Sequence, residues 1–388
     1  MDRSNPVVVV SAVRTPLGAF QGELSSLTAP QLGAVAVRAA LQRAGVDKVD
    51  EAYMGCVLPA GLGQAPARQA ALGAGLPDSV PCTTVNKVCG SGMKAVMLAH
   101  DVLLAGSAEV VVAGGMESMS NAPYLLDKAR GGMRLGHGKV YDHMFLDGLE
   151  DAYDRGKLMG VFAEETAKHF GFTREQQDEF ALLSLARAQE AQKSGAFGVE
   201  IVPVTAKTEV VLDEGPRVAR PEKIPLLKPA FREGGTVTAA NASSISDGAA
   251  ALVLMRRSKA DALGLDVLAT IRGHASHAQA PAWFTTAPVG SISKLLEQTG
   301  WSSGEVDLFE INEAFAVVAM AAMREHNLPG AKVNVHGGAC ALGHPIGASG
   351  ARLVVTLVHA LRRKGLKKGI ATLCIGGGEA VALAVEAA

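Results

Sequence analysis

One order of predicted elements occurs twice in this chain, and the repeat restricts the possible folds more than any other feature. Ser91-Gly92 begins an apolar helical stretch, which is followed by a glycine turn and the strand-like run Val110–Ala113. Ser349-Gly350 begins a second helical stretch, which is followed by a glycine turn and the run Ile370–Leu373. The two Ser-Gly pairs are 258 residues apart (349 minus 91). The repeat predicts an internal duplication of two α/β halves.

Glycines follow the strand-like run in both copies, as Gly114-Gly115 in the first and Gly376–Gly378 in the second. We expect the two halves to face each other, with strand-to-helix turns from both contributing to one cleft. Ligands favour such turns in α/β sheets. The apolar run Val7–Val13 predicts a buried strand, and Ala29–Ala44 predicts a helix that ends at Gly45.

Length and composition are typical of a large α/β protein. The 388 residues favour two or three domains, and 48% of them are hydrophobic while 19% are charged. The 37 basic and 38 acidic residues give a formal net charge of -1. This balance gives no electrostatic footprint for nucleic acid or for an anionic membrane surface, so we expect neither as a partner.

The five cysteines are scattered and have no Cys-x-x-Cys spacing. This pattern argues against both a disulfide framework and a cysteine-based zinc site, and it fits the reduced cytosol. The N-terminal residues match neither a secretory signal nor a transit peptide, and no uncharged apolar run reaches the roughly 18 residues of a membrane span. We therefore expect a cytoplasmic protein without a bound metal.

The composition of the sequence changes between the two copies of the repeat. Residues 121–153 resemble an extended loop region, and Met159–Lys193 is helical with Thr173 as a plausible capping residue. The chain then returns to the first half through a strand-like run, Ala249–Met255. We therefore predict a first half of residues 1–118 plus 245–268, an inserted lobe of residues 119–244, and a second half of residues 269–388.

Cys89 lies directly before Gly90 and the start of the first apolar helix. A helix N-terminus offers free N–H groups and a partial positive charge, and both favour a thiolate. An ordinary thiol has a pKa of about 8.5 and is mostly protonated at neutral pH, so a nucleophilic cysteine needs such help. We interpret Cys89 as a candidate nucleophile, although cysteines in this kind of sequence often only pack in a core.

His344 is followed by Pro345, which fixes the backbone and would hold the imidazole at a set angle. The unperturbed pKa of histidine, about 6.5, suits a proton acceptor for a thiol. Other histidines, among them His100 and His274, have no comparable setting, and we interpret them as ordinary surface or core residues.

Cys374 follows the second strand-like run and precedes three glycines, Gly376 among them. A second thiol there could move protons to and from a carbon acid, and the glycine N–H groups could stabilise an oxyanion. Asn312 follows the strand-like run Val306–Ile311 and could hold a water molecule or donate to an oxyanion. Two thiols and an imidazole on tight turns favour carbon-acyl transfer through a thioester.

These segments resemble those of the thiolase family, most closely its acetyl-CoA acetyltransferase (acetoacetyl-CoA thiolase) members. The resemblance extends over nearly the whole chain, and its motifs are highly specific when taken together. The motifs are Asn86–Gly92, Gly114–Ser120, Asn241–Ser243, Asn312–Phe315, Gly343–Gly350 and Cys374–Gly378. The resemblance implies an α/β fold with a duplicated mixed sheet in α/β/α/β/α layers and an inserted loop lobe.

The family chemistry implies a two-step, ping-pong acyl transfer without a cofactor or metal, in which coenzyme A is a substrate. Cys89, deprotonated with help from His344, would attack a thioester or a 3-ketoacyl-CoA and become acylated. Cys374 would serve as acid and base. His344 and a water molecule on Asn312 would stabilise the enolate, and the N–H groups of Cys89 and Gly376 would stabilise the tetrahedral intermediate.

The resemblance also assigns coenzyme A contacts to the inserted lobe and its surroundings. Ser243 should contact the pantetheine, and Arg217 matches an arginine that lies against the adenine. The tunnel should be lined by Ala239, Ile245, Phe231, Met159 and Ala314. Many relatives have His-Met-Gly where this chain has Leu158-Met159-Gly160, so we expect one polar contact to coenzyme A to be missing here.

Several alternatives stay open at this point. The nearest is a degradative 3-ketoacyl-CoA thiolase for longer chains, and Trp283-Phe284 departs from the biosynthetic pattern near the acyl pocket. A 3-ketoacyl synthase would have His or Asn in place of Cys374. A dinucleotide-binding dehydrogenase is disfavoured because Gly61–Pro66 breaks the Gly-x-Gly-x-x-Gly pattern. A non-catalytic binding protein would not require Cys89.

The apolar, glycine-rich loop Gly132–Phe145 favours a homo-oligomer, either a dimer or a tetramer.

Overall fold

The computed structural model describes residues 4–388. The expectation that the N-terminal residues form neither a secretory signal nor a transit peptide therefore lies, for the first three residues, outside the described part of the chain. Ten of the described strands form one continuous mixed sheet in the order β12-β13-β14-β11-β1-β10-β5-β3-β4, with β2 paired to β10. The strands of the first half are β1 (Val7–Arg14), β2 (Gly18–Ala19), β3 (Glu51–Gly55), β4 (Cys82–Val85), β5 (Val110–Ser118) and β10 (Ser246–Arg256). The strands of the second half are β11 (Ala269–Ala278), β12 (Leu308–Ile311), β13 (Lys368–Ile375) and β14 (Glu379–Ala387).

The pairing of these strands confirms the predicted duplication. In the first half β1 is antiparallel to β10, β10 is antiparallel to β5, and β5 is parallel to β3. In the second half β11 is antiparallel to β14, β14 is antiparallel to β13, and β13 is parallel to β12. The halves join through the equivalent strands β1 and β11, where Val8 lies opposite Thr270.

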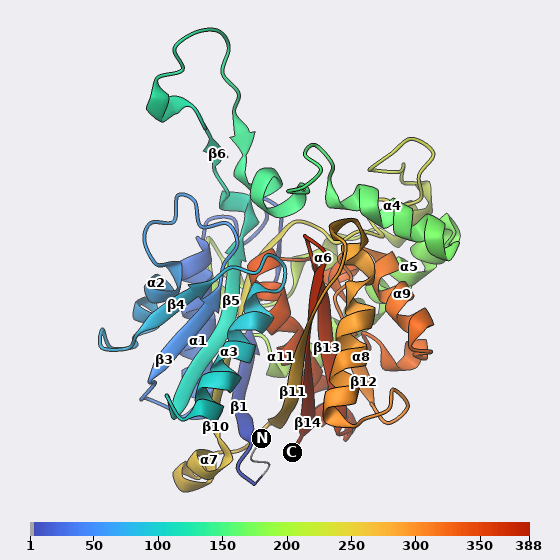
Figure 1. Ribbon diagram of the computed structural model, residues 1–388. Coiled ribbons are helices and arrows are strands. Elements are labelled where there is room, and N and C mark those ends of the chain that lie inside the picture. The colour runs from blue at the N-terminus through green and yellow to red at the C-terminus, as the bar shows by residue number, and fades with distance from the viewer. Residues whose placement is uncertain (1–3) are drawn as a thin grey trace.

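Helices cover both faces of each half, which gives the five layers α/β/α/β/α (Figure 1). The central layer is formed by α3 (Ser91–Ala105) and α11 (Ile346–Lys364), which pack on each other and on strands of both halves. The outer helices are α1 (Ala29–Ala44) and α2 (Pro66–Gly73) on the first half and α8 (Ala287–Thr299) and α9 (Ala316–Glu325) on the second. Among the described residues, the short helices α7 (Arg257–Leu263) and α10 (Ala339–Leu342) lie outside these layers, and α6 (Glu214–Val218) belongs to the inserted lobe.

Strand β1 shows why such a run is apolar throughout. Val8 and Val10 belong to the core beneath α1, whereas Val7 and Val9 belong to the core around α3 and α11. Because both faces of the strand are covered, alternation with polar residues is lost. The segment Val88–Ala105 is long and apolar enough to cross a membrane by length and composition alone. In this fold it forms the turn before α3 and α3 itself, and the central position of this helix between the two sheet halves explains its apolar composition.

Gly114 and Gly115 lie inside β5, so the prediction that they follow a strand of four residues, Val110–Ala113, was wrong. A Cβ at Gly114 would lie 2.0 Å from the carbonyl oxygen of Ala250, and one at Gly115 would lie 2.0 Å from that of Gly347. The glycines are needed because β10 and the start of α11 approach the strand closely. Cys374 likewise lies within β13 rather than after it.

Residues between β5 and β10 of the first half form an additional lobe. Its main helices are α4 (Met159–Phe170) and α5 (Arg174–Lys193), and its paired short strands are β6 (Tyr124–Leu125) with β7 (Tyr141–Asp142) and β8 (Val204–Thr205) with β9 (Glu209–Val210). The predicted capping box is present, since Thr173 Oγ1 accepts a hydrogen bond from Gln176 N at 3.2 Å. The residue boundaries proposed for the three parts stay a prediction.

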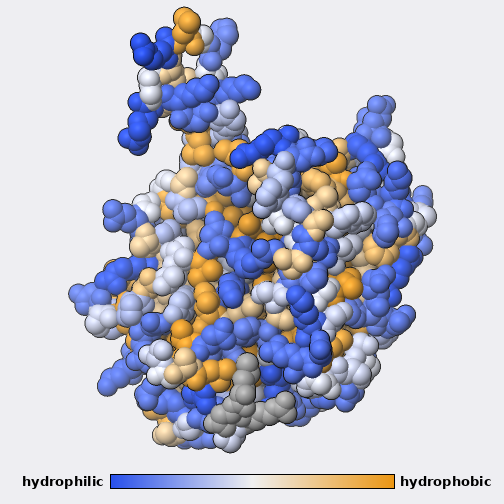
Figure 2. Space-filling model, viewed as in Figure 1, coloured by the Kyte–Doolittle hydropathy of each residue, from blue (hydrophilic) through white to orange (hydrophobic). Residues whose placement is uncertain are grey.

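The segment between β6 and β7 projects far from the body of the molecule (Figure 1). Figure 2 shows apolar residues at the tip of this projection beside strongly polar ones. The exposed apolar side chains of the segment and its base are Tyr124, Leu126, Met133, Leu135 and Val140.

Candidate active site

A strained turn between β4 and α3 carries Cys89. Val88 has a φ of 45°, which is a rare backbone conformation for a β-branched residue. Local hydrogen bonds hold the turn, since Asn86 Oδ1 accepts from Val88 N at 3.0 Å and Ser91 Oγ donates to the carbonyl oxygen of Val88 at 2.7 Å. A Cβ on Gly90 would lie 2.4 Å from Ile375 Cδ1, so only glycine lets the segment that contains Cys374 lie against the nucleophile turn.

The thiol of Cys89 is protonated at neutral pH in this structure. Burial raises the pKa of Cys89 to about 11, although the N–H groups of Gly376 and of Cys89 itself lie within hydrogen-bonding reach of the sulfur and lower it. The prediction that the helix N-terminus favours a resting thiolate therefore does not hold for the unliganded site, because desolvation outweighs the backbone N–H groups. The nucleophile consequently needs a base.

His344 can serve as that base. The residue precedes Pro345 and α11, and its side chain is buried. Burial, together with the nearby guanidinium of Arg352, lowers the pKa of His344 to about 3, so the ring is neutral at physiological pH. A neutral imidazole has one nitrogen with a free lone pair and can accept a proton.

Ser349 determines which nitrogen of His344 is free. The hydroxyl of Ser349 donates to the carbonyl oxygen of Pro345 at 2.9 Å, and its oxygen lies 2.5 Å from His344 Nδ1. Because the hydroxyl proton is already used, the oxygen accepts from Nδ1–H, and we assign the lone pair to Nε2. Asn312 Nδ2 faces Nε2 at 3.4 Å, which agrees with this assignment. Sequence reasoning gave Ser349 no role, although its place five residues after His344 within one motif was a usable signal.

Asn312 lies directly after β12, and its backbone N–H donates to the carbonyl oxygen of Thr372 on β13 at 3.0 Å. Its side-chain oxygen Oδ1 is buried and has no hydrogen-bond partner among residues 4–388. Such an atom is costly to leave unpaired, and a bound water molecule is the simplest partner for it.

Cys374 and Gly376 complete the arrangement from the second half. The side chain of Cys374 is buried beside Phe284, Ala314 and Phe315, and its pKa is raised well above the usual value by burial and by the nearby Cys89. The N–H of Gly376 points at the Cys89 sulfur. The structure thus brings together two protonated thiols and two N–H donors, and the neutral imidazole of His344 lies beside Asn312.

Glu117 is a further residue of this site that sequence reasoning left without a role. It lies on β5, is buried, and accepts hydrogen bonds from the N–H groups of Val57, Leu58 and Gly347 at 2.9, 3.1 and 2.8 Å. Burial raises the pKa of Glu117 to about 7. The carboxyl group holds the start of α11 to the first half, which positions the two halves of the site relative to each other.

Most of the residues assigned to coenzyme A lie around one wall beside the thiols. Ser243 N donates to the carbonyl oxygen of Ala314 at 2.9 Å, and Ile245 packs in a cluster that includes Cys89. The rings of Phe231 and Phe315 meet edge to face with centroids 5.8 Å apart. Met159 begins α4, and its sulfur lies 3.5 Å from the position of a Cβ on Gly376.

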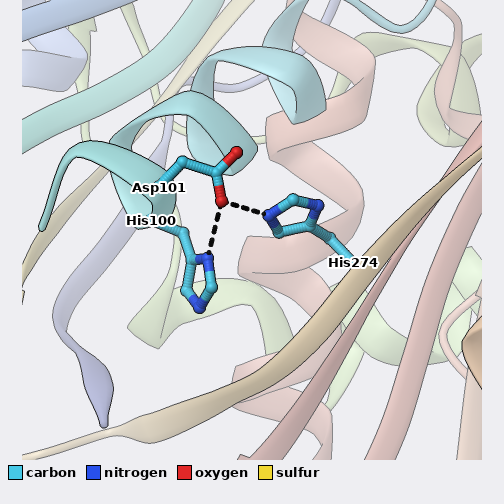
Figure 3. A group of neighbouring side chains, drawn as sticks. All are labelled: His100, Asp101 and His274. Carbon is cyan, nitrogen blue, oxygen red and sulfur yellow. Dashed lines mark hydrogen bonds and ion pairs between the residues drawn. The ribbon is translucent and has the colours of Figure 1, made fainter. Parts of the chain in front are cut away.

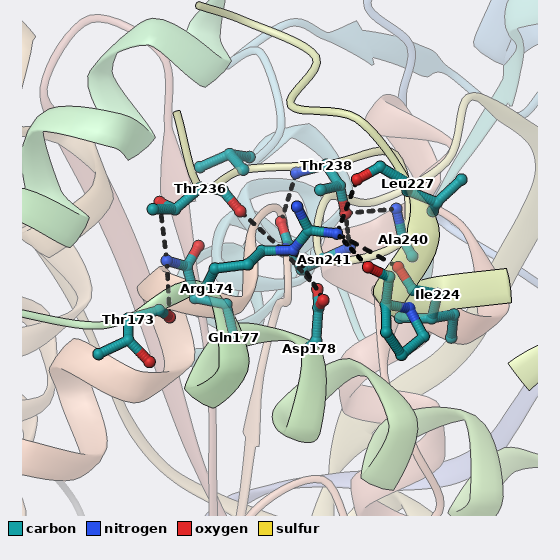
Figure 4. Close-up of polar contacts among 12 residues, drawn as sticks. Thr173, Arg174, Gln177, Asp178, Ile224, Leu227, Thr236, Thr238, Ala240 and Asn241 are labelled. Atoms are coloured by element: carbon teal, nitrogen blue, oxygen red, sulfur yellow. Dashed lines mark hydrogen bonds and ion pairs between the residues drawn. The ribbon is translucent and has the colours of Figure 1, made fainter. Parts of the chain in front are cut away.

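The loop of residues 236–241, which includes Ala239, is hydrogen-bonded to side chains of α5 (Figure 4). Asn241 Nδ2 donates to Asp178 Oδ1 at 3.0 Å, and Asn241 Oδ1 accepts from Thr238 N at 2.7 Å. Arg174 binds Asp178 Oδ2 at 2.7 Å and the carbonyl oxygen of Leu227 at 2.8 Å. These contacts fix the backbone of residues 236–241. They therefore also fix the position of Ser243, which follows this segment in the wall described above.

Arg217 is placed differently from the other residues assigned to coenzyme A. Its guanidinium forms an ion pair with Glu23, and both side chains are partly exposed. A cavity of about 380 Å³ nearby is lined by Ala239 and by two basic residues that sequence reasoning missed, Arg220 and Lys223. The basic stretch from Arg217 to Lys223 was visible in the sequence, but the direction of each side chain was not.

The geometry agrees with the relatives of this chain. Its residues 7–258 match the family model for the thiolase N-terminal domain, and residues 265–387 match that for the thiolase C-terminal domain. The chain belongs to the thiolase family.

Similar proteins cover this thiolase over almost its full length. It is 52% identical over 98% of its length to an acetyl-CoA acetyltransferase of Cupriavidus necator, of which 99% is covered. It is 53% identical to the acetyl-CoA acetyltransferase of Escherichia coli, with 98% of each chain covered. The crystal structure of the Acat5 thiolase from Ascaris suum in complex with coenzyme A matches 99% of this chain and 100% of its own, with a TM-score of 0.94 and 43% identity.

Proposed function

We propose that this thiolase is an acetyl-CoA C-acetyltransferase, which condenses two molecules of acetyl-CoA to acetoacetyl-CoA and cleaves the product in reverse. The observation that carries the proposal is that groups from the second half surround Cys89. The N–H of Gly376 points at the Cys89 sulfur, the thiol of Cys374 lies nearby, and α11 packs against the helix start that follows the Cys89 turn. The names of the relatives from Cupriavidus necator and Escherichia coli support the same substrate.

In the first half-reaction Cys89 loses its proton to Nε2 of His344 and attacks the thioester carbonyl carbon of acetyl-CoA. The carbonyl oxygen becomes an oxyanion, which the N–H groups of Cys89 and Gly376 stabilise. The bond from carbon to the coenzyme A sulfur then breaks. Cys374 gives its proton to the leaving sulfur, and acetyl-Cys89 remains.

In the second half-reaction the Cys374 thiolate removes an α-proton from a second acetyl-CoA. The enolate oxygen accepts from protonated Nε2 of His344 and from a water molecule that Asn312 Oδ1 holds. The enolate carbon attacks the acetyl group on Cys89, and the Cys89 thiolate leaves and recovers the proton from His344. Acetoacetyl-CoA and one free coenzyme A result, so atoms and charge balance.

Coenzyme A would lie along the wall of Ser243, Ala314 and Phe231, with Met159 and Ile245 at the end near the thiols and Ala239 farther out. The cations nearest to Ala239 are Arg220 and Lys223, which suit the phosphate groups of the nucleotide part. Arg217 would have to release Glu23 before it could stack on the adenine. The chemistry described here requires neither a metal nor a further cofactor, and we propose none for it.

A chain-length series distinguishes this proposal from a degradative 3-ketoacyl-CoA thiolase. The measurement is kcat/KM for thiolysis of acetoacetyl-CoA and of 3-ketoacyl-CoA substrates with six, eight and ten or so acyl carbons. We expect the highest value for acetoacetyl-CoA, with a steady fall as the chain lengthens. A rise with chain length would assign the protein to the degradative class.

We also propose a cytoplasmic homo-oligomer, a dimer or a tetramer, on the grounds of the cysteine pattern and the projecting segment. Leu135, at 98% exposure, is the most exposed of the apolar side chains on the projection. Such a segment suits a contact with a second copy. Light scattering on wild type and Leu135→Glu tests this: a smaller assembly in the variant supports the contact, and an unchanged mass contradicts it.

A further inference from the structure

Three side chains with metal-binding atoms meet between α3 and β11 (Figure 3). His100 and Asp101 come from α3 in the first half, and His274 comes from β11 in the second. His274 Nε2 lies 2.8 Å from Asp101 Oδ1, and His100 Nδ1 lies 3.3 Å from the same oxygen. One nitrogen of each imidazole therefore points at the same carboxylate.

The separation of these atoms suits one transition-metal ion. All three ligand atoms lie within 4.8 Å of one another. Ligand atoms that bind zinc at about 2.0–2.2 Å with tetrahedral angles are roughly 3.3 Å apart, so small side-chain rotations bring them to that spacing. Two imidazole nitrogens with one carboxylate oxygen favour zinc, cobalt or nickel over magnesium or calcium, which prefer oxygen ligands alone.

The place of the cluster in the fold allows an ion to enter and keep water ligands. Asp101 is about half exposed, whereas the imidazole of His100 is almost fully buried and so is fixed in position. His100 also lines a cavity of about 510 Å³ together with Arg272, Trp301 and Glu386. The open side of the cluster leaves room for a water molecule as the fourth ligand.

We propose that His100, Asp101 and His274 bind one divalent transition-metal ion of the zinc class, and that this ion fastens α3 to β11 across the junction of the two halves. Cys89 precedes the N-terminus of α3, whereas His100 is nine residues from the first residue of the helix, or about 14 Å along it. The ion therefore stabilises the fold and takes no part in acyl transfer. The proposal is independent of the substrate preference proposed above.

The test is a zinc titration of the chelator-treated full-length protein by calorimetry, with thermal unfolding at each zinc concentration. The variant is His274→Gln, because glutamine can still donate a hydrogen bond to Asp101 but is a poor metal ligand. The control is His137→Gln, which removes an exposed histidine of the projection. Binding at the catalytic thiols is common to all three proteins and cancels in the comparison.

We expect wild type and His137→Gln to bind one zinc ion that His274→Gln binds at least about tenfold more weakly. Zinc should raise the Tm of the first two proteins by several degrees more than that of His274→Gln. Cobalt bound at the cluster should show visible absorption of a tetrahedral complex that is lost in the variant. Equal binding and equal Tm shifts in the three proteins would overturn the proposal and leave Asp101 as an acceptor of two histidine hydrogen bonds.

Discussion

Gly350 packs directly on the backbone of Met93, so that a Cβ at position 350 would lie 2.4 Å from the nitrogen of Met93. The contact has a counterpart, because a Cβ on Gly92 would lie 2.9 Å from the nitrogen of Ala351. Each residue of one contact is 258 positions from its equivalent in the other. The starts of α3 and α11 therefore meet through the two copies of one motif, and Cys89 and His344 each lie just before one of these two helix starts.

Gly350→Ala should destabilise the protein, because the added methyl group has no space between two backbones. Overpacking of this kind costs about 1–3 kcal/mol in the free energy of unfolding. Urea unfolding checks this against Gly198→Ala, where a Cβ meets nothing within 4 Å and φ is not positive. Equal stability of the two variants would contradict the close helix contact.

Ser349→Ala should lower kcat while KM changes little. Without the serine oxygen, the proton of His344 is no longer held on Nδ1, and the lone pair is not kept on Nε2. We expect a loss of about tenfold or more, since a positioned base contributes about 10²–10⁴ to the rate. Ser293→Ala is the matched control, because Ser293 also donates to the carbonyl four residues before it but makes no hydrogen bond to a histidine among residues 4–388. Equal kcat in both variants would exclude this role.

The reactivity of Cys89 should rise with pH without a plateau near neutrality. Its pKa of about 11 means that the thiolate fraction grows about tenfold for each pH unit between about 7 and 10. The rate of alkylation by iodoacetamide, followed at Cys89 by peptide mass spectrometry, measures this directly. A rate that levels off below pH 8 would show a resting thiolate, as the sequence alone suggested.

Because the pKa of His344 is lowered by folding, the free energy of unfolding depends on pH. The folded-state value of about 3 is below the unfolded value of about 6.5, so the stability that the neutral ring provides is complete above about pH 6.5 and is lost as pH falls toward 3. Relative to His344→Asn, wild type should lose about 2 kcal/mol between pH 6.5 and 5. Urea unfolding at these two pH values measures the difference, and a pH-independent difference would mean that the ring is not desolvated.

The sequence predicted those features of the fold that depend on local patterns. The duplication was visible in two Ser-Gly helix starts and the strand-like runs that follow, and the boundaries of Ala29–Ala44 agree with α1 because Gly45 ends the helix with a φ of 66°. Gly114 and Gly115 were misread because their neighbours, Ala250 and Gly347, are more than 130 residues away in the chain. No local pattern reports such contacts.

For the site, residue types were predictable and electrostatics was not. The motifs identified Cys89 and His344, but burial, which depends on both halves, decides that the resting pair is neutral. The roles of Ser349 and Glu117 follow from contacts of their side chains, and the residues assigned to coenzyme A stay predictions. Arg217 shows the limit, because its position in the motif did not reveal its ion pair with Glu23.

The most direct test of the acyl-cysteine mechanism is the cleavage of acetoacetyl-CoA with free coenzyme A by wild type and by Cys89→Ala, followed by loss of the enolate absorbance. We expect clear turnover by wild type and a loss of several orders of magnitude in the variant, because the covalent nucleophile is removed. Turnover by Cys89→Ala at a rate close to wild type would contradict the acyl-cysteine mechanism.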